Sequence, residues 1–154
     1  MATDLDMMRF ITGHAWPAEQ IDEFLARQRR HIRNHGVCFG AVELTDRMQV
    51  IGIAGMQPLD AGDLQGEFEL GWWIWKDFWG QGMALEAIRP FITHARNMGL
   101  QRLLAVIDPP NAASIRVAEK LGMQFDRTVS ARATIASRED KTVSVYAIDL
   151  KRPK

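Results

Sequence analysis

The chain has 154 residues, of which 47% are hydrophobic, so it suits one domain with a real core and leaves little room for two. Nineteen basic and nineteen acidic residues balance, which argues against a nucleic-acid partner or an anionic membrane surface. The single cysteine, Cys38, excludes an intrachain disulfide, and no apolar run approaches the length of a membrane span. We therefore expect one soluble domain over residues 1–154, located in the reducing cytoplasm.

The first strong pattern along the chain is a helix between Pro17 and Gly36. The residues at helical spacing are Ile21, Phe24, Leu25, Gln28 and Ile32. Two strands are predicted next, within residues 37–44 and 48–59, and a short polar turn joins them. A third strand is predicted within residues 66–76, in the tryptophan-rich stretch "GEFELGWWIWK". The pattern of this half of the chain is therefore one helix followed by three strands.

Residues 80–98 predict a second amphipathic helix, which Gly99 ends. The short apolar run within residues 100–108 suits a strand that is buried on both faces. A further helix is predicted over residues 111–122, with Asn111 as its cap. Two final strands, within residues 125–134 and 142–150, are separated by the polar loop "IASREDK". Together these elements predict a single α/β domain with a mixed sheet.

Two glycines, Gly80 and Gly82, stand between the third strand and the second helix, in "FWGQGMALEA". Glycine at such a junction leaves main-chain N–H groups unshielded, and the helix dipole adds a positive potential at the same place. This combination favours an anion, usually a phosphate, whereas an ordinary tight turn is the alternative. The turn has neither a Gly-Lys-Ser/Thr ending nor a Gly-x-Gly-x-x-Gly pattern, which disfavours other kinds of nucleotide-binding domain.

The stretch from Phe68 to Phe125 resembles the core of the GCN5-related N-acetyltransferases (GNAT), closest to their ribosomal-protein N-terminal (RimJ/RimL-like) branch. Three features carry the resemblance: a Glu-Leu-Gly strand, the turn Trp-Gly-Gln-Gly-Met-Ala, and a helix that opens with Asn-Ala-Ala-Ser and ends in Glu-Lys-Leu-Gly. It implies a mixed central sheet flanked by helices. Members usually have a strand ahead of a segment like residues 7–25. Only a few residues precede that segment here, so we expect the first strand to be absent. The next strand is then expected at the sheet edge, covered by a second subunit or a rearranged terminus.

The resemblance also implies acetyl-CoA as the acetyl donor, with its pyrophosphate on the glycine turn and its pantetheine arm along the edge of the third strand. The residues that it implies for cofactor binding are Trp72, Trp73, Ile74, Trp79, Gly80, Gln81, Gly82, Met83, Ala84 and Asn111. Gly82 is expected to matter most, since a Cβ there would intrude on the diphosphate. Plain core packing is the alternative for the tryptophans. The four histidines show no metal-ligand spacing, so no metal is expected.

Glu69 is the predicted general base, acting directly or through a water, because an attacking amine must lose a proton. Glu67 and Glu69 share one face of a regular strand, so the residues alone leave both as candidates. The resemblance selects Glu69, and Glu67, nearer the start of the strand, is expected to be solvated. Burial is expected to raise the pKa of Glu69. Ser114 matches the serine that assists departure of the thiolate in this branch, and Tyr146, on the last strand, is the alternative.

The predicted function is transfer of acetyl from acetyl-CoA to a primary amine, either a protein N-terminus or a small amine. An α-amine, with a pKa near 8, has about a tenth of its molecules neutral at pH 7, whereas a lysine amine is almost always charged. The alternative is a non-catalytic acyl-CoA-binding regulatory module that has kept the cradle and lost turnover. The basic run from Arg27 to His35 reads as a solvated helix face, or else as a border of the acceptor site.

Overall fold

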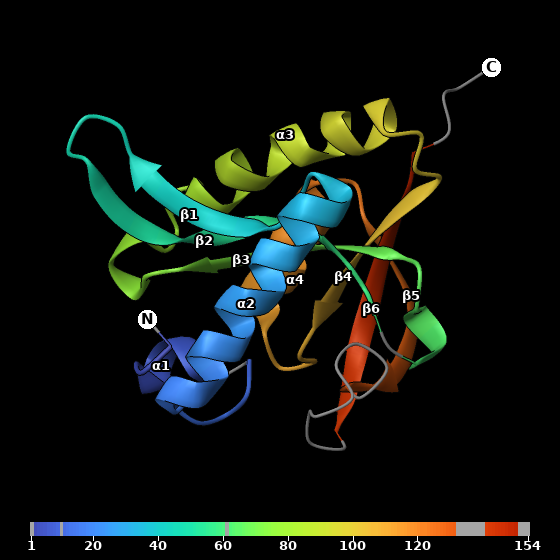
Figure 1. Ribbon diagram of the computed structural model, residues 1–154. Coiled ribbons are helices and arrows are strands. Elements are labelled where there is room, and N and C mark those ends of the chain that lie inside the picture. Colours follow the sequence, from blue (N-terminus) through green and yellow to red (C-terminus); the bar gives the residue numbers. More distant parts are fainter. Residues whose placement is uncertain (1, 10, 61, 132–140, 151–154) are drawn as a thin grey trace.

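The computed structural model describes residues 2–9, 11–60, 62–131 and 141–150. In this part of the chain a six-stranded mixed sheet has the order β1-β2-β3-β4-β6-β5 and is flanked by helices (Figure 1). The strands are β1 (Phe39–Leu44), β2 (Gln49–Pro58), β3 (Phe68–Ile74), β4 (Arg102–Ile107), β5 (Gln124–Ser130) and β6 (Thr142–Asp149). The helices are α1 (Leu5–Met8), α2 (Ala18–His35), α3 (Met83–Asn97) and α4 (Ala112–Lys120), with the 3-10 turns η1 (Gly62–Leu64) and η2 (Lys76–Phe78). The predicted α/β class is confirmed.

The helix ends follow the signals in the sequence. Helix α2 starts after Pro17 and stops at Gly36, whose φ of 73° is left-handed and whose N–H donates to the carbonyl of Ile32. The short helix α1 was not predicted, because four residues are too few to show a helical period. Its cap is Asp4, whose Oδ1 accepts from the N–H of Met7 at 3.0 Å.

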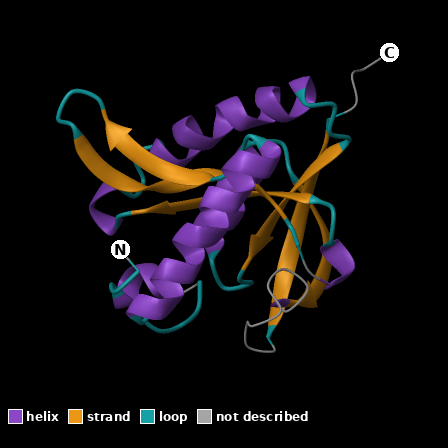
Figure 2. Ribbon diagram, in the orientation of Figure 1, coloured by secondary structure: helices purple, strands orange, loops and turns teal. Residues whose placement is uncertain are grey.

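The helices divide between the two faces of the sheet (Figure 2). Leu70 of β3 packs in the main core with Ile88 and Ile92 of α3. On the opposite face, the ring of Phe24 from α2 lies 5.5 Å from that of Trp73. Helix α2 therefore covers one face, and α3, together with α4, covers the other.

The exposed side of α2 differs from the expectation. Leu25 and Ile32 are 44% and 47% exposed, although they have the helical spacing. Gln28, which shares that spacing, is buried as the pattern indicates, and the polar residue His31 is buried as well. Hydrogen bonds of Gln28 to Gln57 and to the N–H of Phe39 offset the cost of burying this amide. His31 bonds to Asp60 through Nε2, while its buried Nδ1 has no hydrogen-bond partner among the described residues. No helix in the described part of the chain has the length and apolar character that a bilayer crossing needs.

The sheet opens between β3 and β4. Strand β2 pairs with β3 along the whole of β3, from Phe68 to Ile74, but β3 and β4 pair only at Glu69 and Leu104. Beyond that point the two parallel strands run apart, as Figure 1 shows. The divergence leaves the second half of β3 without a strand partner on that side.

The edges of the sheet are β1 and β5. No strand precedes α2 among the described residues, so β1 lies at one edge, as the resemblance led us to expect. The strand predicted within residues 125–134 is observed as β5, which ends at Ser130. Residues 132–140, with most of the predicted polar loop, lie outside the described residues.

Candidate active site

Two adjoining cavities lie where β3 and β4 separate. The first, here called the Glu69 cavity, has a volume of about 80 Å³ and is walled by α2, β3 and β4. The second, the glycine-turn cavity, has about 280 Å³ and is walled by β3, the turn at Gly80 and Gly82, and α4. The residues that line both are Ile11, Trp72, Trp73, Asn111 and Ser114. The cavities therefore meet between the second half of β3 and the first turn of α4.

The glycine turn presents main-chain donors to the second cavity. Gly80 and Gly82 have φ values of 72° and 80°, which favour glycine, and a Cβ built on either would meet no atom within 4 Å. Gly82 is the N-cap of α3 and makes no side-chain cap, so within the described part of the chain the N–H groups of Met83 and Ala84 have no capping side chain. Both residues line the cavity. The positive end of α3 thus faces open space that suits an anion.

The two polar side chains of the turn take structural roles. The indole Nε1 of Trp79 donates to the carbonyl of Ile74 at 2.6 Å, and its ring lines the glycine-turn cavity. The side-chain amide of Gln81 donates to the carbonyl of Asp77 at 3.0 Å, and Gln81 lines neither cavity. Any contact of Gln81 with a ligand in this geometry is therefore made by its main chain.

The backbone of β3 offers an open edge. The N–H of Trp75 donates to the carbonyl of Ile51 on β2, and main-chain groups alternate in direction along a strand, so those of Trp72 and Ile74 face the gap. The carbonyl of Ile74 accepts the hydrogen bond from Trp79, so Trp72 is the residue of this half of β3 whose main-chain N–H and carbonyl remain open toward the gap. The ring of Trp73 packs against Trp16 and Phe24, with centroid distances of 5.8 and 5.5 Å. The packing interpretation holds for that ring.

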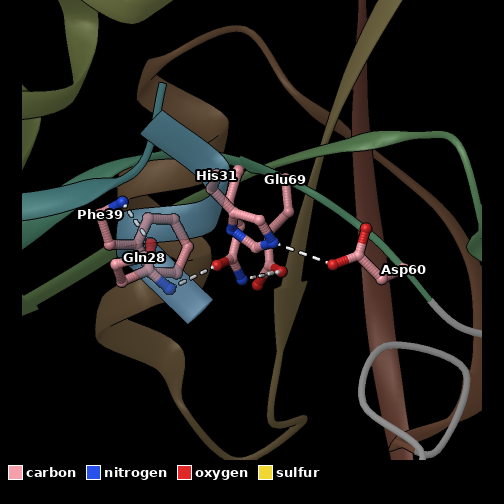
Figure 3. Close-up of polar contacts among 6 residues, drawn as sticks. Gln28, His31, Phe39, Asp60 and Glu69 are labelled. Atoms are coloured by element: carbon pink, nitrogen blue, oxygen red, sulfur yellow. Dashed lines mark hydrogen bonds and ion pairs between the residues drawn. The ribbon is translucent and has the colours of Figure 1, made fainter. Parts of the chain in front are cut away.

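Glu69 is 7% exposed and lines the first cavity. Its Oε2 accepts a hydrogen bond from Nε2 of Gln57 at 3.2 Å (Figure 3). The other charged side chains along this cavity are Arg27, Asp108 and Lys141, of which the last two form an ion pair at 3.3 Å. The basic run on α2 therefore reaches the cavity through Arg27.

Glu67 lies apart from both cavities. Its Oε1 accepts from Nε of Arg102 at 3.0 Å and from Nη2 at 2.6 Å, and the hydrogen bond to Glu67 raises the pKa of Arg102. The expectation that Glu67 is solvated is therefore wrong, because this carboxylate is held in a half-buried ion pair. The structure brings Glu69, and not Glu67, to the cavity wall.

Helix α4 supplies two polar groups at the junction of the cavities. Asn111 is its N-cap, and Oδ1 of Asn111 accepts from the N–H of Ser114 at 3.1 Å. Since an N–H only donates, the oxygen must face the helix, and Nδ2 keeps its two donors for another partner. The Ser114 side chain borders both cavities, whereas Tyr146 lies in the core against Phe125 and lines neither.

Two cations in the glycine-turn cavity were missed by the sequence reasoning. Arg116 and Lys120 lie four residues apart on α4, so they share one helix face, and both line this cavity. Neither has an ion-pair partner within the described ranges. The signal in the sequence was the spacing of the two basic residues behind Ser114. No cluster of three potential metal ligands is found among the described residues.

Comparison with known proteins identifies the family. Residues 1–124 match the family described as acetyltransferase (GNAT) domain, and the chain therefore belongs to the GNAT acetyltransferases. Its relative YkkB of Bacillus subtilis (strain 168), an uncharacterized protein, is 32% identical over 144 residues, which cover 93% of this chain and 78% of YkkB.

Solved structures share the fold. An acetyltransferase from Agrobacterium tumefaciens str. C58 is similar with a TM-score of 0.73 and 24% identity, over 96% of this chain and 82% of the other. The microcin C7 self-immunity acetyltransferase MccE, solved in complex with acetyl-CoA and AMP, is similar with a TM-score of 0.71 and 14% identity, over 94% and 79% of the two chains. At these identities the likeness shows the fold.

Proposed function

We propose that this chain is an acetyl-CoA-dependent N-acetyltransferase that moves an acetyl group to a primary amine by direct attack. The observation that carries the proposal is the junction of the two cavities. One contains open main-chain donors and two cations, and the other contains a buried carboxylate. Membership of the GNAT family and the acetyl-CoA bound to the similar protein MccE support this donor.

The glycine-turn cavity is the proposed acetyl-CoA site. The N–H groups at the start of α3 would hold the pyrophosphate, as at other helix N-termini, and Arg116 and Lys120 would add positive charge for the phosphates. The open edge at Trp72 would pair with the pantetheine arm as an added strand does. Nδ2 of Asn111 would donate to a pantetheine carbonyl. In this arrangement the thioester lies near the junction of the two cavities.

The Glu69 cavity is the proposed acceptor site. The amine nitrogen forms a bond to the thioester carbon, the amine loses a proton to Glu69 directly or through a water, and the carbon–sulfur bond then breaks. The Ser114 hydroxyl would give a hydrogen bond to the departing thiolate, because Ser114 lines both cavities. Acetylated amine and CoA are the products.

The acceptor is proposed to be an α-amine, on a protein N-terminus or on a small molecule. A neutral amine is needed for attack, and α-amines are neutral far more often than lysine side chains at pH 7. The small volume of the cavity, about 80 Å³, suits the end of such a molecule rather than a bulky group. Assignment to the ribosomal-protein N-terminal branch, and a cytoplasmic location, belong to the same proposal.

A screen of acceptors tests this function. The protein is incubated with acetyl-CoA and, separately, with peptides that have free N-termini, with polyamines and with amino acids, while free CoA thiol and the mass of the acceptor are followed. We expect thiol release that depends on an α-amine acceptor, with a gain of one acetyl group on that acceptor. Acetyl-CoA binding by calorimetry without acceptor-dependent release across the panel would favour the non-catalytic module instead.

A further inference from the structure

A buried chain of side-chain amides connects the start of β1 to Glu69. The main-chain N–H of Phe39 donates to Oε1 of Gln28 at 2.8 Å. Nε2 of Gln28 donates to Oε1 of Gln57 at 2.9 Å, and Nε2 of Gln57 donates to Oε2 of Glu69 at 3.2 Å. Figure 3 shows these links in sequence, from α2 across β2 to β3. Gln28, Gln57 and Glu69 are all at least nine-tenths buried.

The direction of this chain is fixed at its far end. A main-chain N–H only donates, so the group of Gln28 that meets Phe39 must be its oxygen. The amide nitrogen of Gln28 then faces Gln57, whose oxygen must accept, and the amide nitrogen of Gln57 is left to face Glu69. Neither amide can be flipped without placing like groups together. Every link therefore donates toward the carboxylate.

We propose that Gln57 and, behind it, Gln28 are positioning residues that hold Glu69 as an oriented, deprotonated carboxylate. Burial alone favours the protonated form of a carboxylic acid, whereas a hydrogen bond donated to the carboxylate favours the charged form. The amide chain thus opposes the effect of burial and keeps the base able to accept a proton. The inference rests on the proposed role of Glu69 in acetyl transfer, but it makes a statement about Glu69 that needs no acceptor to test.

Other charges surround this site and must be kept constant in a test. Helix α2 contributes Arg27 to the same cavity. His31, on the same helix, lies outside the cavity lining, and its Nε2 is 2.9 Å from Oδ2 of Asp60. Asp108, after β4, and Lys141, before β6, form their own ion pair. Strand β2 contains no titratable side chain. A change of Gln57 to an apolar residue of similar length therefore removes one donor and leaves each of these charges in place.

The test is a titration of Glu69 by carbon-13 NMR, in protein labelled at the glutamate carboxyl carbon. The signal is assigned by its loss in Glu69→Gln. In Gln57→Met we expect the titration midpoint of Glu69 to rise by about one pH unit, since a donor to the charged form is lost. Gln28→Met should raise the midpoint of Glu69 by a smaller amount, because Gln57 can still donate to Glu69 but loses the hydrogen bond from Gln28 that orients its amide. Gln101→Met is the control for the substitution itself. The amide of Gln101 donates to the carbonyl of Gly99 and lines neither cavity, so the midpoint of Glu69 should stay unchanged.

An unchanged or lowered midpoint in Gln57→Met would overturn the proposal. If that variant lacks a cooperative thermal transition, the titration of Gln28→Met decides, and no rise in its midpoint overturns the proposal in the same way. Once an acceptor is known, Gln57→Met should also move the acidic limb of kcat to higher pH without changing the KM for acetyl-CoA. A shifted midpoint in a protein with no transferase activity would contradict the proposed function and leave the role of the amide chain intact.

Discussion

Ser114 presents its side chain to both cavities while Asn111 holds its main-chain N–H. If the hydroxyl stabilises the departing thiolate, Ser114→Ala should lower kcat about tenfold, which is the effect of losing one hydrogen bond to a charged group. Its dissociation constant for acetyl-CoA should stay close to that of the wild type in calorimetry. Tyr146→Phe is the control, and it should keep full turnover, because Tyr146 lies in the core. Loss of turnover in the tyrosine variant alone would reverse the two roles.

Arg116 and Lys120 carry a second prediction at the residue scale. Each of Arg116→Gln and Lys120→Gln should weaken binding of CoA several-fold, because charge-assisted contacts to phosphate contribute more than neutral ones. The loss should shrink as salt is raised, since salt screens exposed charges. Arg89→Gln is the control, because Arg89 is exposed on α3 and lines neither cavity. Equal losses of affinity in all three variants would show a general effect of net charge instead.

The choice between Glu67 and Glu69 illustrates what single residues in a sequence can reveal. The alternation of a strand placed both on one face, and only the family resemblance separated them. In the structure the two glutamates differ in their partners, which are distant along the chain. Glu67 pairs with Arg102, and Glu69 accepts a hydrogen bond from Gln57. No spacing rule connects a glutamate with an arginine 35 residues later, so this distinction was beyond the sequence.

At the scale of secondary structure, the turn before α3 provides the sharpest prediction. Gly82→Ala should weaken CoA binding more than tenfold, because a Cβ would occupy the space in front of the open N–H groups. Gly82 also has a φ of 80°, so any side chain there costs roughly 1–2 kcal/mol of strain, and valine would cost more. A substitution at Gly82 is therefore expected to lower the stability of the fold, whereas a substitution at an ordinary loop position would leave that stability nearly unchanged.

Gly99→Ala, at the other end of α3, is the control for the effect of backbone strain. Gly99 has a φ of 79°, and a Cβ there also meets nothing within 4 Å, yet it lines neither cavity. Both variants should lose similar amounts of thermal stability, and only Gly82→Ala should lose affinity for CoA in calorimetry. If Gly82→Ala and Gly99→Ala bound CoA with the same affinity, the turn at Gly82 would not be part of the cofactor site.

Long periodic elements were predicted well and short or polar-faced ones were not. The helices between Pro17 and Gly36 and after Gly82 had clear stops and a helical period, and both are observed as α2 and α3. Part of the buried face of α2 was misjudged, because Leu25 and Ile32 are exposed and the polar residue His31 is buried against a partner on another segment. Hydrophobic periodicity does not detect a helix face whose core contacts are hydrogen bonds.

At the scale of the whole molecule, strand β1 is an edge of the sheet, with β2 as its one strand partner among the described residues. Strand edges with free N–H and C=O groups tend to recruit another strand, so we expect a second subunit, or a rearranged terminus, to cover this one in solution. Light scattering should then give a mass above that of the monomer, or hydrogen exchange should show slow amides along β1. A strict monomer with fast exchange from Cys38 to Glu43 would contradict any such cover.

In the proposed mechanism, Glu69 accepts the proton of the amine that attacks acetyl-CoA at the junction of the two cavities. The decisive measurement is the pH profile of kcat, at saturating acceptor, for the wild type, Glu69→Gln and Glu67→Gln. A general base predicts that Glu69→Gln lowers kcat about a hundredfold and removes the acidic limb, at which the wild-type carboxylate becomes protonated. Glu67→Gln should keep the wild-type profile, because Glu67 pairs with Arg102 outside the cavities. Full activity in Glu69→Gln with loss in Glu67→Gln would contradict the account, and a raised acceptor KM with unchanged kcat would reduce Glu69 to an electrostatic anchor.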